Sequence, residues 1–543
     1  MEWRHVEAAR RVLERETGTI VRDWGGQIPL ALAYPNTYAV GMSSLAIHTL
    51  YQLLNNIPGI LCERTFASLS GRAAPDAPLL TLETQRPVRD VAVLAFSVSF
   101  EMDYFNVIQM LRRAQIPVRA EERGRYDPLV IFGGPAVSAN PEPMAPVADA
   151  IVVGELEPIV TDLVNCFSPA TGRGREEALT QMANVPGVYV PTLHEGERIQ
   201  RQLLRDLDAY PTATSIIAPE AEFGDMYLIE IARGCGWGCR FCLAGYWYRP
   251  PRQRSVKQIL HQAQEGLKYR DKIGLVASAV SDYGEIDSLV TGLRDMGADI
   301  SVSSLRVKPL PPILVCALAE SGAQSITLAP EAGSERLRQV IRKGITHNDV
   351  MDATELVASH DFHTLKLYFM VGLPGETDQD IADLIQMVEE IAGRFPRHIV
   401  VNVTPFVPKA HTPFQRAGVC PQDTLRTRQE RIESELHSRR VEIRVGGVLE
   451  AHTQATLSRG DRRIGEALMA MDTPRPRRWG SALREQGLDW QMYLRERGGK
   501  ETLPWDFIDA GTSPGLLETE YRKSREIMET MRCCNAHVHE EPA

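Results

Sequence analysis

The chain has 543 residues, of which 43% are apolar and 24% charged, and its formal net charge is −10. This composition is typical of a folded protein and excludes a mostly disordered one, and the negative charge argues against binding long nucleic acids through a general basic surface. The first 26 residues are charged throughout, and no apolar run reaches the ~18 residues of a membrane span. Nine cysteines in so long a chain do not indicate a disulfide framework. We therefore expect a cytoplasmic protein without a membrane partner.

Residues 1–167 are predicted to form a Rossmann-like, doubly wound parallel sheet. Continuous apolar runs alternate there with helical patterns, as expected for parallel strands buried on both faces. The strand candidates are IPLALAY (28–34), VAVLAFSV (91–98), LVIFGG (129–134) and AIVVG (150–154). A mixed linker, residues 168–222, follows.

A second alternation of strands and helices fills residues 223–424. The strand candidates are MYLIEIA (226–232), IGLVAS (273–278), DISVSS (299–304), SITLAP (325–330), TLKLYFMVG (364–372) and HIVVNVTPF (398–406). Six parallel strands with covering helices predict a partial (β/α)6 barrel of the TIM type, whose working loops follow the carboxyl ends of the strands. Residues 425–543 are predicted to be mostly helical, with one short strand candidate in residues 441–446.

Three cysteines, Cys235, Cys239 and Cys242, follow the first strand of the second alternation. A structural zinc site needs four ligands, and a redox pair would leave Cys235 unused. An iron-sulfur cluster normally has four thiolate ligands, so three cysteines would leave one iron open to a substrate or cofactor. The glycines between them suit a tight loop, and Phe241 could shield a cluster from water.

This C-x-x-x-C-x-aromatic-C spacing resembles that of the radical S-adenosylmethionine (SAM) enzymes. The resemblance implies that the three thiolates bind a 4Fe-4S cluster and that SAM binds the open iron. It also implies reductive cleavage of SAM to methionine and a 5'-deoxyadenosyl radical. Stretches such as YPNTYAVGMSSLAIHTLY and VTPFVPKAHTPFQ extend the resemblance to an uncharacterised family of these proteins with an N-terminal cobalamin-binding-type domain.

Other strand ends carry residue types that the same resemblance assigns to SAM. An acid after the fourth strand would hold the ribose hydroxyls, and a glycine-rich turn after the fifth would let the backbone approach the adenine. The expected residues are Ser281, Ser304, Arg306, Glu331, Arg336, Gly372, Pro374 and Gly375. Ser334 could instead be a simple helix cap, and the usual glycine-glycine-glutamate form is missing near Ser281.

The N-terminal domain leaves two alternatives open. Cobalamin domains that replace the lower cobalt ligand carry an Asp-x-His-x-x-Gly loop, whereas residues 34–41 read YPNTYAVG and His48 lies further on, in a predicted helix. Bound cobalamin would then lack a histidine ligand, with its tail or phosphate near Gly133 and Gly134. The alternative is a degenerate domain that binds substrate or packs on the barrel.

Basic and titratable residues near the strand ends also have two interpretations. Arg249, Arg252 and Arg254 could bind an anionic substrate or form salt bridges to the neighbouring domain. Lys409 and His411 are the candidates for acid-base catalysis, with a structural histidine as the alternative. The chain ends with a degenerate cluster of Cys533, Cys534, His537 and His539, in which adjacent thiols are poorly suited to one metal.

The sequence thus predicts a radical SAM enzyme that uses a 4Fe-4S cluster and SAM, with cobalamin-dependent methyl transfer to an unactivated carbon as one of two open reaction types. An electron donor such as flavodoxin or ferredoxin would be its partner. The alternatives are a radical SAM enzyme that modifies tRNA, which the net acidity disfavours, and a non-catalytic iron-sulfur or cobalamin sensor.

Overall fold

A computed structural model describes residues 3–71, 77–167 and 174–537, with side chains up to residue 529. In those ranges no helix combines the length and the apolar character needed to cross a membrane. The tail residues Cys533, Cys534, His537 and His539 lie outside the described side chains.

The N-terminal sheet has six strands in the order β2-β1-β3-β4-β5-β6, of which only β6 is antiparallel to its neighbour. Its strands are β1 (Ile28–Thr37), β2 (Ile60–Ser68), β3 (Val93–Ser97), β4 (Leu129–Gly133), β5 (Ala150–Val152) and β6 (Val188–Tyr189). All four predicted strands are present. The sequence pattern missed β2 because charged residues interrupt it, although Arg64 is fully buried there and pairs with Glu16 and Glu83 at 2.6 and 2.7 Å.

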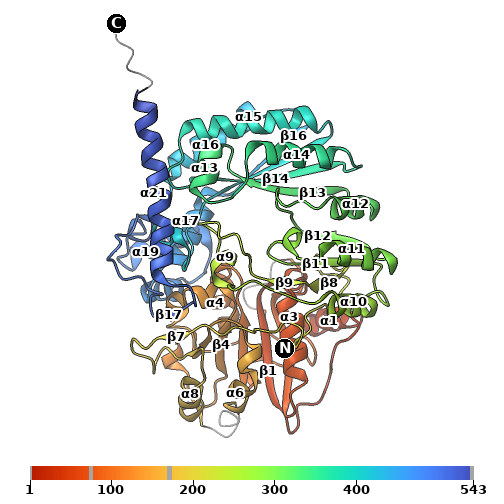
Figure 1. Cartoon of the computed structure of the whole chain (residues 1–543). Coiled ribbons are helices and arrows are strands. Elements are labelled where there is room, and N and C mark those ends of the chain that lie inside the picture. The colour runs from red at the N-terminus through yellow and green to blue at the C-terminus, as the bar shows by residue number, and fades with distance from the viewer. Residues whose placement is uncertain (1–2, 72–76, 168–173, 538–543) are drawn as a thin grey trace.

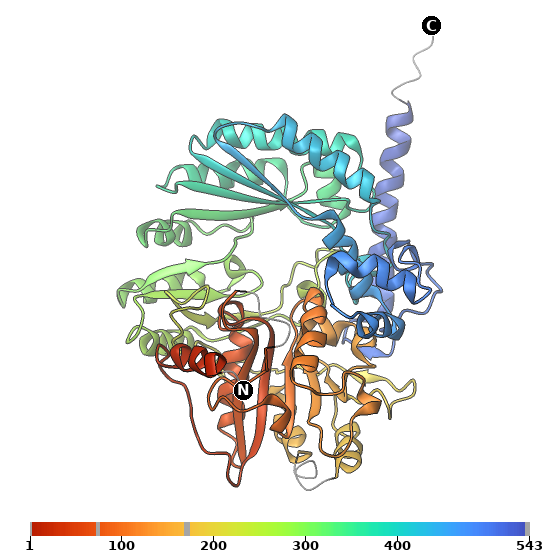
Figure 2. The same cartoon turned by 180° about the vertical axis from the view of Figure 1, so that it is seen from behind.

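Helices cover both faces of this sheet. One face carries α3 (Leu45–Asn55) and α6 (Val160–Asn165), while α4 (Tyr104–Arg113) lies on the other. Two helices from the end of the chain, α18 (Arg462–Ala470) and α19 (Trp479–Glu485), pack into the same apolar core as α4. Figures 1 and 2 show this C-terminal region, in blue, beside the orange N-terminal helices. The C-terminal region therefore helps to build the N-terminal domain.

The second half of the chain contains two parallel sheets. They are β12-β11-β8 and β13-β14-β15-β16, and a parallel bridge between Leu305 and Leu328 links them. Their strands are β8 (Tyr227–Glu230), β11 (Lys272–Val276), β12 (Asp299–Val302), β13 (Ser325–Glu331), β14 (Thr364–Val371), β15 (His398–Pro405) and β16 (Val441–Val445). All six predicted strands are present, and the predicted strand at 441–446 joins the second sheet. The mixed α/β class with parallel sheets is confirmed.

Helices cover one face of each of these sheets. They are α10 (Val256–Gly266), α11 (Ile286–Asp295), α12 (Pro312–Glu320), α13 (Glu335–Val340), α14 (His347–Ala358), α15 (Asp378–Arg394) and α16 (Gln422–Glu435). The helix-free face of the four-stranded sheet is turned toward the N-terminal half of the molecule (Figures 1 and 2).

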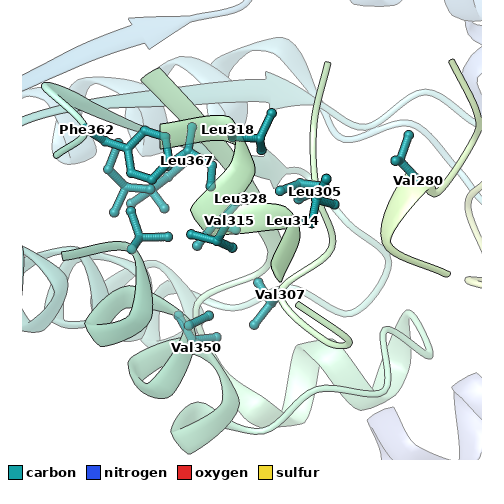
Figure 3. Close-up of a cluster of buried hydrophobic side chains, with 14 of the residues drawn as sticks. Val280, Leu305, Val307, Leu314, Val315, Leu318, Leu328, Val350, Phe362 and Leu367 are labelled. Carbon is teal, nitrogen blue, oxygen red and sulfur yellow. The ribbon is translucent and has the colours of Figure 1, made fainter. Parts of the chain in front are cut away.

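The apolar core under these helices fixes the loops at the strand ends. Figure 3 shows part of this core, in which Val280, Leu305 and Val307 are buried together with side chains of α12 and β13. Val280 precedes Ser281, and Leu305 and Val307 flank Arg306. The residues predicted to bind a cofactor are therefore anchored by their immediate neighbours.

The last helix, α21 (Pro514–His537), packs against α13 and against the short helix η7 (Pro413–Arg416). Its carboxyl-terminal part projects from the body of the molecule (Figures 1 and 2). A helix near the end of the chain thus lies beside the second half of the molecule, which contains the two smaller parallel sheets.

Candidate functional site

The three cysteines lie on a tight loop after β9 (Ala232–Arg233). All three are free thiols, and Cys239 is buried. Gly234 has a φ of +85°, and a Cβ there would lie 2.4 Å from the carbonyl oxygen of Tyr248, so the loop requires glycine at this position. No three His, Cys, Asp or Glu side chains in the described residues converge on a single ion. That geometry is not needed for a cluster, in which each cysteine binds a separate iron.

The environment of the thiols fits a metal cluster. Burial raises the pKa of Cys235, and it raises the pKa of Cys242 to about 11. These two thiols are therefore protonated at neutral pH when no metal is bound, whereas a bound iron cation would stabilise the thiolates.

Side chains from several strand ends meet at Trp237 of this loop. The indole nitrogen of Trp237 donates a hydrogen bond to Asp282, after β11, at 2.7 Å. The guanidinium of Arg306, after β12, stacks on the Trp237 ring with its Cζ 4.1 Å from the ring centroid. Arg306 also donates to the carbonyl of Lys343 at 3.3 Å, and the Lys343 ammonium pairs with Glu331, at the end of β13, at 2.9 Å. The structure thus brings Arg306 and Glu331 into one network with the cysteine loop.

A cavity of about 440 Å³ opens beside this network, lined by Cys235, Trp237, Ser281 and Asp282 among others. The hydroxyl of Ser281 is buried and has no hydrogen-bond partner among the described residues. Burial raises the pKa of Asp282, although the charge of Arg306 acts in the opposite direction. An unsatisfied buried hydroxyl and a partly buried acid beside a thiol fit a polar ligand.

Three further residues predicted to bind SAM, Gly372, Gly375 and Arg336, are in contact with other parts of the protein. A Cβ at Gly375 would lie 2.6 Å from Met528 of α21, and Arg336 donates to the Gly375 carbonyl at 2.9 Å and pairs with Asp380. A Cβ at Gly372 would meet Leu425 and Cys420. The Cβ directions at the two glycines of this turn therefore face α16 and α21.

Four other predicted residues of this region can be placed. Pro374, in the same turn, lines a cavity of about 280 Å³ beside α21, and Phe241 packs against an apolar cluster that contains Leu337. Ser304 is half-buried after β12. Ser334 caps α13 by accepting a hydrogen bond from the amide of Leu337 at 3.0 Å, so the simpler alternative for Ser334 is confirmed.

A third, larger cavity connects the N-terminal domain with the cysteine loop. Its volume is about 510 Å³, and apolar side chains of α3 and α6 line one end. Gly133 and Gly134 line it at the end of β4, and Gly234, Trp247 and Tyr248 line it at the cysteine loop. A Cβ on Gly133 would meet no atom within 4 Å, and the hydroxyl of Thr49 on α3 is buried without a partner among the described residues. The cavity can therefore take a bulky, mainly apolar group near the cysteines.

Glu155, Glu230 and Arg233 line this cavity and form ion pairs, of which those of Glu155 join the two halves of the molecule. Arg252 pairs with Glu155, which follows β5, at 2.8 Å, and Arg254 pairs with Glu230 at 2.7 Å. Arg233, two residues before Cys235, contacts Glu155 at 3.3 Å. The guanidinium of Arg249 stacks on Tyr246 with its Cζ 4.7 Å from the ring centroid. Of the two interpretations of Arg252, an anionic-substrate site or a salt bridge to the neighbouring domain, the structure shows the salt bridge.

Lys409 and His411 have partners that tie them to the N-terminal domain. The Lys409 ammonium pairs with Glu101 at 2.6 Å. His411 is buried, its Nε2 lies 3.0 Å from the carbonyl oxygen of Ala139, and burial lowers its pKa to about 4. A buried neutral imidazole hydrogen-bonded to a backbone carbonyl matches the structural alternative for His411.

His48 lies in α3, as predicted, and is bound at both ring nitrogens. Its Nε2 contacts the carbonyl oxygen of Met42 at 2.9 Å, and its Nδ1 accepts the amide of Ser215 at 3.2 Å. Sequence reasoning missed Thr49 and Trp247, which line the larger cavity. The helical spacing of Thr49 from Leu45 could have indicated that the two residues share one face of the helix, and both line this cavity.

Comparisons with known proteins agree with this geometry. Residues 46–191 match the model for the N-terminal region of radical SAM proteins, and residues 229–388 match the radical SAM superfamily model. An uncharacterized protein of Methanocaldococcus jannaschii is 33% identical over 71% of this chain and 79% of its own length. An uncharacterized methyltransferase of Pyrococcus horikoshii is 25% identical over 48% of this chain and 58% of its own.

Two solved structures share the fold over most of the chain. TsrM from Kitasatospora setae, with cobalamin and a [4Fe-4S] cluster bound, covers 85% of this chain and 99% of its own, with a TM-score of 0.50 and 12% identity. OxsB, with aqua-cobalamin and SAM bound, covers 94% of this chain and 80% of its own, with a TM-score of 0.51 and 13% identity. From the sequence matches and the cysteine loop we conclude that this chain belongs to the radical SAM superfamily of enzymes.

Proposed function

We propose that this protein cleaves SAM reductively at a 4Fe-4S cluster bound by Cys235, Cys239 and Cys242, and uses cobalamin in the N-terminal domain to methylate an unactivated carbon. The observation that carries this proposal is the cavity of about 510 Å³ that runs from the N-terminal sheet to the cysteine loop. One electron from the reduced cluster would break the sulfonium carbon–sulfur bond and give methionine and a 5'-deoxyadenosyl radical, while cobalamin would supply the methyl group. The electron would come from a donor such as flavodoxin or ferredoxin.

The β8–β16 region would act as a partial (β/α)6 barrel that presents polar groups to SAM. The unsatisfied hydroxyl of Ser281 and the carboxyl of Asp282 lie beside Cys235, where they can bind polar groups of the cofactor. Arg306 stacks on Trp237, and Glu331 follows through Lys343, so the loop and the strand ends are held together before SAM binds. Preorganised polar groups of this kind bind and orient a cofactor without a large rearrangement.

The N-terminal domain would bind cobalamin through its apolar cavity. Side chains of α3 and α6 exclude water from a planar apolar group, and the open space beside Gly133 leaves room for it. The hydroxyl of Thr49 offers one hydrogen bond inside the cavity. The two solved structures of similar fold, which bind cobalamin, support this assignment.

A cavity-filling variant tests cobalamin binding directly. Gly133 lines the cavity and a Cβ there would meet no atom within 4 Å, so Gly133→Val adds volume at the cavity wall. Gly25→Val would add the same volume at an exposed glycine of the same domain. After anaerobic incubation with hydroxocobalamin and gel filtration, we expect stoichiometric cobalamin absorbance in the wild type and Gly25→Val. The affinity of Gly133→Val should be at least tenfold weaker. Equal retention by all three proteins, or by none, would contradict the proposal.

Modification of tRNA is the second candidate function. Its support is similarity to the tRNA-2-methylthio-N(6)-dimethylallyladenosine synthase of Pelotomaculum thermopropionicum, which is 25% identical over 43% of this chain and 54% of its own length. This function would require salt-sensitive binding of tRNA. A filter-binding titration of bulk tRNA at 50 and 200 mM salt would support it only if binding is tight at the lower concentration and weakens at the higher one.

A further inference from the structure

We propose that Glu520, on the last helix, positions the cysteine loop through Arg240 and sets the reduction potential of the cluster that the loop binds. The inference rests on the cluster assigned to Cys235, Cys239 and Cys242. It gives α21, which lies almost 280 residues further along the chain than the cysteines, a role in the cofactor site.

Arg240 lies between the second and third cysteines and is 4% exposed. Its Nε and Nη2 both donate to Oε2 of Glu520, at 3.2 and 3.1 Å. Its Nη1 donates to the carbonyl oxygens of Gln339 and Val340, at 3.0 and 2.7 Å, at the end of α13. The side chain of Arg240 therefore joins the cysteine loop to two helices at once.

The backbone of Arg240 is also fixed, by two hydrogen bonds. Its amide donates to the carbonyl of Ile341 at 2.9 Å, and its own carbonyl accepts the amide of Phe414 at 3.1 Å. The Phe414 ring packs edge-on against Tyr521, the residue after Glu520, with the ring centroids 6.2 Å apart. Glu520 thus contacts the side chain of Arg240 directly, and Tyr521 contacts Phe414, which is hydrogen-bonded to the backbone of Arg240.

Glu520 balances more positive charge than that of Arg240 alone. It is 4% exposed; its Oε2 also lies 3.1 Å from Arg342, and its Oε1 accepts a hydrogen bond from Lys523 at 3.0 Å. One buried carboxylate therefore faces three cations, of which Arg240 lies between two of the cysteines. Arg342 and Lys523 are half exposed, so solvent screens them more than it screens Arg240.

This arrangement predicts the sign of the effect on the cluster. Reduction adds one negative charge to the cluster, and the potential of a cluster depends on nearby net charge, hydrogen bonds and solvent exposure. Neutralising Glu520 leaves the cations uncompensated, which stabilises the reduced cluster and raises the potential. Removing the charge of Arg342 leaves Glu520 less compensated, which lowers the potential.

The experiment measures the reduction potential of the reconstituted, full-length protein by anaerobic spectroelectrochemistry with redox mediators. The variants are Glu520→Gln and Arg342→Gln. The matched control is Glu518→Gln, which removes the same charge from an exposed position two residues away on the same helix. Iron content and cluster absorbance are recorded for each protein, so loss of the cluster is distinguished from a change in its potential.

We expect the potential of Glu520→Gln to shift upward, that of Arg342→Gln to shift downward, and that of Glu518→Gln to match the wild type. Equal potentials in all four proteins, or the same shift in Glu518→Gln and Glu520→Gln, would overturn the inference. If Glu520→Gln does not retain a cluster, an unchanged potential in Arg342→Gln overturns it. A wild type that binds no cluster would instead contradict the proposed function.

Discussion

The two terminal nitrogens of Arg252 each donate a hydrogen bond of 2.8 Å to a carboxylate oxygen of Glu155, across the contact between the cysteine-loop segment and the N-terminal domain. Both side chains are 7% exposed. Burial acts to raise the pKa of Glu155, but the hydrogen bonds from Arg252 and the charge of Arg233 outweigh it, so this pKa lies below its usual range. The ion pair is therefore a buried connection between the cysteine-loop segment and the N-terminal domain.

Breaking this pair should destabilise the protein. Arg252→Leu leaves the Glu155 carboxylate buried with less compensation, and loss of one partner of a buried ion pair costs about 3–5 kcal/mol. Urea unfolding followed by tryptophan fluorescence should show the loss. Arg394→Gln, which breaks an exposed pair with Glu355, should cost at most about 1 kcal/mol. Equal effects of the two changes would contradict the assignment.

The buried histidines should make stability depend on pH. Burial lowers the pKa of both His48 and His411 to about 4, below the unfolded value of about 6.5. The unfolded chain therefore binds more protons between these values, and stability falls as the pH falls from 7 to 5, by roughly 2 kcal/mol for each histidine.

Denaturant titrations at pH 7 and pH 5 measure this effect. His411→Gln keeps a hydrogen-bond donor for the Ala139 carbonyl and should lose about half of the pH dependence. A pH dependence identical to that of the wild type would show that His411 does not contribute.

Two adjacent glycines at the end of β4 should respond differently to substitution. Gly134 has a φ of +103°, and a Cβ there would lie 2.4 Å from the carbonyl oxygen of Val98. Gly134→Ala should therefore cost about 3 kcal/mol through backbone strain and steric overlap. Gly133→Ala meets open space and should change stability by less than about 1 kcal/mol. Similar losses of thermal stability in both variants would contradict this difference.

Local sequence patterns predicted most of the framework. The apolar runs predicted β1 and β3, because parallel strands buried on both faces are continuously apolar. The strands of the second half were predicted from apolar runs that alternate with helical patterns, although helices cover only one face of their sheets. The spacing of Cys235, Cys239 and Cys242 predicted the loop that we propose to bind the cluster, since the three thiols lie within eight residues. Strands and loops that are defined by residues close together in the chain could therefore be predicted from the sequence.

Contacts between residues that lie far apart in the chain could not be predicted from the sequence. Glu520 lies 280 residues from Arg240, and no local pattern joins them. The cavity under α3 and α6 depends on how two helices pack on one sheet, and Gly372 and Gly375 face packing partners that only the fold supplies. Strand β2 was missed because the buried charge of Arg64 is compensated by Glu16 and Glu83, which lie outside that strand.

The most direct test of the central claim is the formation of 5'-deoxyadenosine from SAM. The protein is purified without oxygen, reconstituted with iron and sulfide and reduced, and the product is quantified by liquid chromatography. We expect product from the wild type and from Cys316→Ala, which removes a free thiol far from the loop in sequence, and none from Cys239→Ala. No product from a wild type with a verified reduced cluster and bound SAM, or undiminished product from Cys239→Ala, would contradict the account.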